Sequence, residues 1–206
     1  MSNITEQMAC TPVPLNSNGF NARTALPYGL EISQIQSAMQ DFLDFLGFIN
    51  NQLYTKSIPR LETMLMSANF SSIVGEFMSA TIPKYCKTLT KNRHHNGHPD
   101  LVPTGFYKDD DILHGSEGIE IKASRYIKGW QGHNPEDVWL MVFVFDSNRA
   151  KDTIPNRFKF ISVAGALLTQ SDWNFSGRSG TSRRTITASV TPSGFSKMSA
   201  NWIYRD

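Results

Sequence analysis

The feature that most restricts the fold of this chain is the run from Asp137 to Asp146, DVWLMVFVFD, in which only apolar residues stand between two acids. Successive side chains of a β-strand point to opposite faces of its sheet, so a strand that is apolar throughout must be covered on both faces. The run therefore predicts a central strand that is buried on both sides, in a sheet with other elements packed against it.

Two helical zones precede this strand. From Glu31 to Tyr54 apolar residues recur at spacings of three and four, which is the period of a helix with one buried face. A second zone extends from Leu61 to Met78, after a break at Pro59, with an interruption expected near Asn69. The first 25 residues are rich in Asn, Thr, Pro and Ser and are predicted to form an irregular arm.

Further strands are predicted on both sides of the apolar run. They comprise Asp100–Val102, Gly118–Ser124, Arg157–Ala166, which is expected to continue into a short helix, and Thr185–Thr191. Helices followed by strands predict an α/β protein with a central mixed β-sheet flanked by helices and a mainly helical N-terminal third.

The composition is typical of one globular domain. The chain has 206 residues, of which 40% are hydrophobic and 18% charged, enough for a core without a metal or disulfide staple. Two cysteines, Cys10 and Cys86, favour a reduced, cytoplasmic location. We expect neither a membrane span nor a signal peptide, since no apolar run reaches about 18 residues and the N-terminus lacks a basic start. The expected division of the chain is an arm (1–25), a helical region (26–90), a sheet region (91–166) and a basic tail (167–206).

The net charge is only +2, but the charges are unevenly distributed. No acid occurs between Phe77 and Pro99 or between Trp173 and Arg205, whereas the acids gather between Asp109 and Glu120. Basic flanks around an acidic centre would suit a polyanion held over a metal site. The alternative is an unevenly charged, solvated surface.

The candidate catalytic groups lie near the Gly118–Ser124 strand. Its period places Ile119 and Ile121 on one face and Glu120 and Lys122 together on the other, where the carboxylate of Asp100 could join them. Two hard oxygen ligands with room for water and a phosphate oxygen suit Mg²⁺. A neighbouring lysine can orient a water molecule and offset phosphate charge, so these residues predict metal-assisted hydrolysis of a phosphodiester.

The order Pro99-Asp100, nineteen intervening residues and Glu120-x-Lys122 resembles the PD-(D/E)xK signature of many type II restriction endonucleases. The resemblance covers roughly residues 97–146. It implies a restriction-endonuclease-like fold in which Asp100, Glu120 and the carbonyl of Ile121 bind Mg²⁺ and Lys122 assists the attacking water. Double-stranded DNA is the implied substrate.

Other acids are weaker candidates for the same site. Glu76, in the second helical zone, could lie near the metal as in many members of that family, or could be an exposed helix residue; Glu62 is a weaker choice for the same role. The run Asp109, Asp110 and Asp111 is a rival source of the first carboxylate, although such runs are usually solvated loops.

Three loops are expected to contact DNA. The loop after Lys122 interleaves cations, aromatic residues and amides, which could hold phosphates and read base edges; alternatively, it is a surface loop with Trp130 in the core. A histidine-rich loop is expected to enter the active site, and a zinc site there is disfavoured because no cysteine lies at ligand spacing. The candidate DNA-binding residues are Ser124, Arg125, Lys128, Gln131, His133 and Asn134 in the first loop, Arg93 and His94 in the histidine-rich loop, and Arg178, Arg183 and Arg184 in a basic stretch of the tail.

The expected function is that of a Mg²⁺-dependent type II restriction endonuclease, which hydrolyses double-stranded DNA at a specific site. A homodimer is expected, because a two-fold protein matches a palindromic site and cuts both strands. Two alternatives stay open: a non-catalytic DNA-binding protein on the same fold, and a structure-specific repair nuclease.

Overall fold

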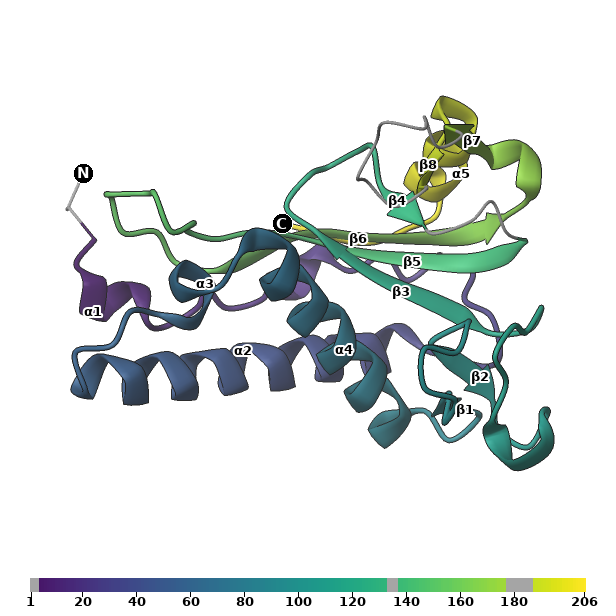
Figure 1. Ribbon diagram of the computed structural model, residues 1–206, viewed down its shortest axis with the longest axis horizontal. Coiled ribbons are helices and arrows are strands. Elements are labelled where there is room, and N and C mark those ends of the chain that lie inside the picture. Colours follow the sequence, from purple (N-terminus) through teal and green to yellow (C-terminus); the bar gives the residue numbers. More distant parts are fainter. Residues whose placement is uncertain (1–3, 133–136, 177–186) are drawn as a thin grey trace, which may run out of the picture.

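The computed structural model describes residues 4–132, 137–176 and 187–206. Across these residues a six-stranded sheet has the order β1-β2-β3-β5-β6-β9, in which β3 and β5 are parallel and the other neighbours are antiparallel (Figure 1). Its strands are β1 (Leu89–Lys91), β2 (Leu101–Pro103), β3 (Ile119–Ser124), β5 (Val138–Asp146), β6 (Lys159–Leu168) and β9 (Trp202–Arg205). A small antiparallel sheet contains β4 (Gln131–Gly132), β8 (Thr187–Val190) and β7 (Trp173–Ser176), in that order.

The helices lie mainly before the sheet in the chain. The α-helices are α1 (Glu6–Ala9), α2 (Ile32–Thr55), α3 (Leu61–Met64), α4 (Ser67–Tyr85) and α5 (Pro192–Ala200), and short 3-10 turns cover Ser17–Gly19, Lys108–Asp110 and Gln170–Asp172. Helices α2 and α4 cover one face of the main sheet, while α5 and the small sheet lie over the other (Figure 1). No helix in the described ranges is long and apolar enough to cross a membrane.

Strand β5 is buried on both faces, as its sequence predicts. Trp139, Met141, Phe143 and Phe145 pack into the core beneath α2 and α4. The alternate residues face a second core; these are Val138, Leu140, Val142 and Val144. That core includes Trp130, which precedes β4, Trp173 on β7 and Met198 on α5. The predicted class, a mixed α/β protein with a helical N-terminal region, is confirmed.

Several element boundaries differ from the prediction. Helix α2 agrees with it to one residue at each end, but the second helical zone breaks at Leu65–Met66 rather than near Asn69. It then continues to Tyr85 with Pro83 inside it. Strand β6 extends to Leu168, so the short helix that follows is the 3-10 turn at Gln170–Asp172.

The two ends of the chain are more ordered than predicted. The N-terminal arm contains α1, and Val13 donates its amide to the carbonyl of Phe158 over 2.8 Å. The predicted basic tail contributes β7, β8, α5 and β9, and β9 is the last strand of the main sheet. Of these C-terminal elements, β8 corresponds to the strand predicted at Thr185–Thr191, whereas β7, α5 and β9 were not predicted.

A close contact in the core gives a prediction about stability. A Cβ added to Gly165 on β6 would overlap the ring of the buried Trp139 on the neighbouring strand β5. Gly165→Ala is therefore expected to lower the free energy of unfolding by about 1–3 kcal/mol, the usual cost of overpacking. The measurement is urea unfolding. Leu167→Ala is the control, since Leu167 on the same strand is 60% exposed. This substitution should change the free energy of unfolding by no more than about 0.5 kcal/mol. Equal stability of Gly165→Ala and the unaltered protein would contradict this packing.

Candidate active site

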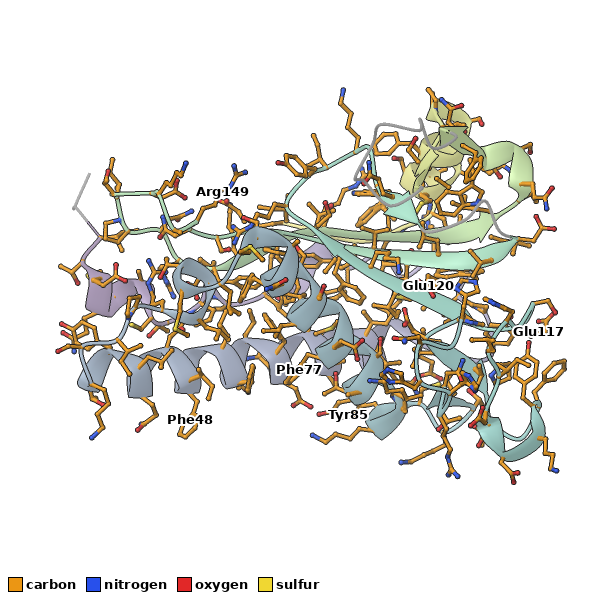
Figure 2. All side chains as sticks on the ribbon, in the orientation of Figure 1. Phe48, Phe77, Tyr85, Glu117, Glu120 and Arg149 are labelled. Atoms are coloured by element: carbon orange, nitrogen blue, oxygen red, sulfur yellow. The ribbon has the colours of Figure 1, made fainter. Side chains whose placement is uncertain are left out.

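A cavity of about 750 Å³ lies beside β3 and is lined by Asp100, Glu120 and Lys122. Its other walls come from α4, from the loop before β2, from His114 in the loop before β3, from β5, and from β4 and β7 of the small sheet. The structure thus brings together the three side chains of the sequence motif. Glu120 and Lys122 follow Asp100 by 20 and 22 residues in the chain. Figure 2 shows Glu120 on β3, beside the loops near β2. Its neighbour on the paired strand is Leu140, which faces the second core.

Asp100 is held at the edge of β3 by the backbone. Strands β2 and β3 pair at Leu101 and Ile119, and just beyond this pair the carboxylate Oδ2 of Asp100 accepts the amide of Ile121 over 2.8 Å. Gly118 permits this approach, because a Cβ there would overlap Leu101 O and its φ is +144°. The first carboxylate of the motif is therefore fixed next to the strand that carries the second.

Glu120 is buried and has two basic neighbours. Only 8% of the residue is exposed. Its Oε1 accepts a hydrogen bond from Lys122 Nζ, and its Oε2 lies 2.9 Å from His98 Nδ1. His98 also lines the cavity. A lysine and a histidine thus hold the carboxylate of Glu120 in one orientation.

The environment changes the pKa of the two carboxylates in opposite directions. Burial and the neighbouring charge of Glu120 raise the pKa of Asp100, against the opposing effects of Lys122 and the Ile121 amide. Burial also acts to raise the pKa of Glu120, but the hydrogen bond from His98 and the charge of Lys122 outweigh it and lower that pKa. The raised pKa of Asp100 thus reflects its burial first and the charge of Glu120 second, and a bound cation would offset both by favouring the charged carboxylate.

The residues present fit a hard cation such as Mg²⁺. In the described ranges no three His, Cys, Asp or Glu side chains form a group that could hold a metal by themselves. A cation here would use the carboxylates of Asp100 and Glu120, the carbonyl of Ile121, water and a substrate oxygen. Mg²⁺ commonly keeps several waters in this way. The Ile121 carbonyl is available because the N–H and C=O of one strand residue face the same edge, here the edge at which Asp100 lies.

The other predicted acids lie in different surroundings. Glu76 on α4 lines the cavity, but its side chain is 67% exposed and pairs with Lys91 over 2.6 Å. Glu62 is fully buried away from the cavity, where it pairs with Arg60 over 2.6 Å.

The rival acidic run does not line the cavity. Asp110 accepts the amide of Gly105 over 2.7 Å, and Asp111 lies 2.6 Å from His94 Nδ1. Asp109 is exposed at a positive φ of 57° in the same turn. These contacts stabilise the loop before β3, and Asp100 is the better placed source of the first carboxylate.

The histidine-rich loop is divided between the cavity and the surface. Arg93 is exposed and His94 pairs with Asp111, and neither lines the cavity, whereas Asn96 and His98 do. The loop therefore reaches the site through its C-terminal half.

Arg125 has structural contacts that the sequence did not predict. Its guanidinium donates to the carbonyls of Ser147 and Asn148 and lies 5.7 Å and 5.2 Å from the ring centres of Phe70 and Phe145. It is thus engaged in joining the end of β3 to the β5–β6 connection, and this geometry does not favour its predicted role in DNA binding.

The remaining DNA-binding candidates lie in two groups. Ser124 and Gln131 line a second, smaller cavity, and Lys128 is exposed in the same loop. His133, Asn134, Arg178, Arg183 and Arg184 lie outside the described residues. Trp130 is 6% exposed, so the alternative expectation that it packs into the core is confirmed.

Sequence reasoning missed two features that shape the site. The histidine-rich loop, which ends at His98, was expected to enter the active site, but the contact of His98 with Glu120 was not predicted. The position of His98 two residues before Asp100 is a signal that it accompanies the motif. Tyr28, from the segment before α2, was not considered; its hydroxyl accepts the Gly118 amide and donates to Glu117, each at 2.8–2.9 Å. It anchors the entry to β3, and no local pattern connects residues so far apart.

Comparison with known proteins does not extend this description. No protein-family model matches the chain, and no curated protein or solved structure matches it.

Proposed function

We propose that this protein is a Mg²⁺-dependent endonuclease that hydrolyses the phosphodiester bonds of double-stranded DNA. The observation that carries the proposal is the placement of Asp100, Glu120 and Lys122 around one cavity, with Asp100 bound to the backbone amide between the other two. Two carboxylates and a lysine around one cavity are groups suited to metal-assisted hydrolysis of a phosphodiester.

Each side chain has a distinct task in this reaction. The carboxylates of Asp100 and Glu120 would hold the cation, which when bound lowers the pKa of water and stabilises charge on the phosphate. Lys122 orients the attacking water and offsets negative charge near the phosphorus. The water oxygen forms a bond to phosphorus and releases a proton to solvent, the bond from phosphorus to one sugar oxygen breaks, and that sugar oxygen takes up a proton from solvent. His98 positions Glu120, since its Nδ1 lies 2.9 Å from the carboxylate.

The more specific part of the proposal is a type II restriction endonuclease acting as a homodimer on a palindromic site. It is supported by the resemblance of the motif and by the basic, amide-containing loops on both sides of it. A two-fold dimer places one site on each strand of such a sequence. The dimer is checked by the mass of the protein in solution, which should be twice the 23.1 kDa of one chain.

Incubation of the protein with phage DNA tests the activity. We expect discrete fragments with Mg²⁺ or Mn²⁺, little turnover with Ca²⁺, and no cleavage in excess chelator, because the donor set is made of hard oxygen atoms. The fragments are resolved on a gel and their ends sequenced. A smear would instead identify a non-specific or repair nuclease, and binding without any cleavage would identify a DNA-binding protein. Full cleavage in excess chelator would contradict the proposed mechanism.

A further inference from the structure

A second cavity adjoins the candidate active site. Its volume is about 310 Å³, and it is lined by Ser124, Tyr126, Gly129, Trp130 and Gln131. It also shares Lys122 and Ala123 with the larger cavity, so the two meet along β3. The volume lies at the lower end of the roughly 300–1,000 Å³ typical of small-molecule sites, which suits a single ring system rather than a larger ligand.

One wall of this second cavity is held firmly. Trp130 donates its indole N–H to the carbonyl of Tyr126 over 2.8 Å, and its ring centre lies 5.4 Å from that of Phe195 on α5. The Trp130 carbonyl accepts the amide of Val190 on β8 over 2.9 Å. Gly129 supplies the positive φ of 75° that the turn before Trp130 requires. The wall is therefore built on the second core and does not depend on a ligand for its shape.

The rest of the lining combines an aromatic face with polar groups. Tyr126 lines the cavity and is 66% exposed, so its aromatic ring is accessible to a ligand. Gln131 is exposed and offers an amide, and Ser124 accepts the Tyr126 amide over 3.0 Å while keeping its own hydroxyl proton to donate. Ile127, next to Tyr126, is 63% exposed. A flat, partly apolar ligand with a hydrogen-bonding edge matches this set.

We propose that the second cavity binds a nucleobase that has left the DNA stack. This inference rests on the proposed function, because it places a DNA phosphate beside Lys122, and Lys122 is part of the wall that both cavities share. The base would stack on Tyr126 and bond through its edge to Gln131 and Ser124, as enzymes that extrude bases commonly arrange. The exposed apolar Ile127 would enter the duplex beside the displaced base.

The test uses two duplexes of the same sequence that need no knowledge of a recognition site. In one duplex a single 2-aminopurine is unpaired as a bulge, and in the other it is paired with thymine. Binding is measured in Ca²⁺ by anisotropy, together with the 2-aminopurine fluorescence. We expect the protein to bind the bulged duplex roughly 5- to 150-fold more tightly, the range that corresponds to about 1–3 kcal/mol for one base stacked on an aromatic side chain. Its fluorescence should also change on binding.

Variants identify the cavity as the source of the preference. Tyr126→Ala should bind both duplexes equally. Gln131→Ala should also lower the ratio of the affinity for the bulged duplex to that for the paired duplex. Tyr54→Ala is the matched control, because Tyr54 is an exposed tyrosine (42%) on α2 that lines neither cavity, and it should keep the full preference. Thermal unfolding confirms that all three variants are folded.

The outcomes separate this inference from the proposed function. Cleavage of phage DNA with equal affinity for the two duplexes overturns the base-binding cavity alone. A preference for the bulged duplex that Tyr126→Ala removes, without cleavage of any DNA, supports the cavity and overturns the hydrolytic function. A preference that survives in Tyr126→Ala and Gln131→Ala overturns the cavity, and failure to bind either duplex overturns both proposals.

Discussion

Asp100→Asn should reduce DNA cleavage in Mg²⁺ by roughly 100- to 1,000-fold, the size of effect that follows loss of one group that stabilises transition-state charge. The asparagine has nearly the same shape as aspartate, and its carbonyl oxygen can still accept the Ile121 amide that Asp100 accepts at 2.8 Å. The change therefore removes the charge that would hold the cation and leaves the edge of β3 intact. Cleavage rates of the variant and the unaltered protein on the same plasmid give the ratio.

Binding and a matched control separate chemistry from folding. In Ca²⁺ the Asp100→Asn variant should bind the cleaved duplex at least as tightly as the unaltered protein, because a negative charge that faces phosphate has been removed. Asp109→Asn is the control: Asp109 is exposed in the nearby acidic run and does not line the cavity, so its cleavage rate should be unchanged. Normal cleavage by Asp100→Asn, with loss of cleavage in Asp110→Asn or Asp111→Asn, would show that the first carboxylate has been assigned wrongly.

Arg60→Ala is expected to lower the free energy of unfolding by about 3–5 kcal/mol, the usual cost of leaving one member of a buried ion pair alone. Arg60 is 2% exposed, and its guanidinium bonds to Glu6 over 2.8 Å, Glu62 over 2.6 Å and Asn148 over 2.7 Å. Glu62 is 0% exposed, and after the substitution its carboxylate would retain Asn50 as a hydrogen-bond donor. The change thus leaves a buried charge poorly compensated.

Urea unfolding followed by circular dichroism measures this loss. Arg149→Ala is the control, because Arg149 lies in the neighbouring β5–β6 connection (Figure 2) and is exposed; its effect should stay within about 0.5 kcal/mol. A loss below about 1 kcal/mol in Arg60→Ala would mean that water compensates the carboxylate of Glu62, and the network would then not be a major source of stability.

The structure explains why some elements could be predicted from the sequence. The apolar run of β5 needs cover on both faces wherever it lies, and the period of α2 is set by contacts between residues three and four positions apart. Both signals are contained within one element. The candidate motif could be found for the same reason, since the alternation of β3 places Glu120 and Lys122 on one face without any information from the rest of the chain.

Contacts between distant segments decided the features that the sequence did not predict, such as the partners of charged side chains and the position of the last strand. Arg125 follows β3 and resembles a DNA contact in the sequence, but it is bound to the carbonyls of Ser147 and Asn148. Glu62 was a weak candidate for a residue near the metal and instead pairs with Arg60. Strand β9 joins the main sheet from a segment that was predicted to be a basic tail. A charged side chain takes the partner that packing brings near it, and packing depends on the whole fold.

The sequence by itself determined the buried central strand, the long helix and the order of Asp100, Glu120 and Lys122, because each depends on residues that are close in the chain or on their order. The tertiary structure alone decided that Asp100 reaches the amide of Ile121, that His98 lies against Glu120, and that a second cavity opens beside Lys122. These contacts join segments whose approach is set by the packing of two cores against one sheet, and the free energy of that packing is not contained in any local pattern.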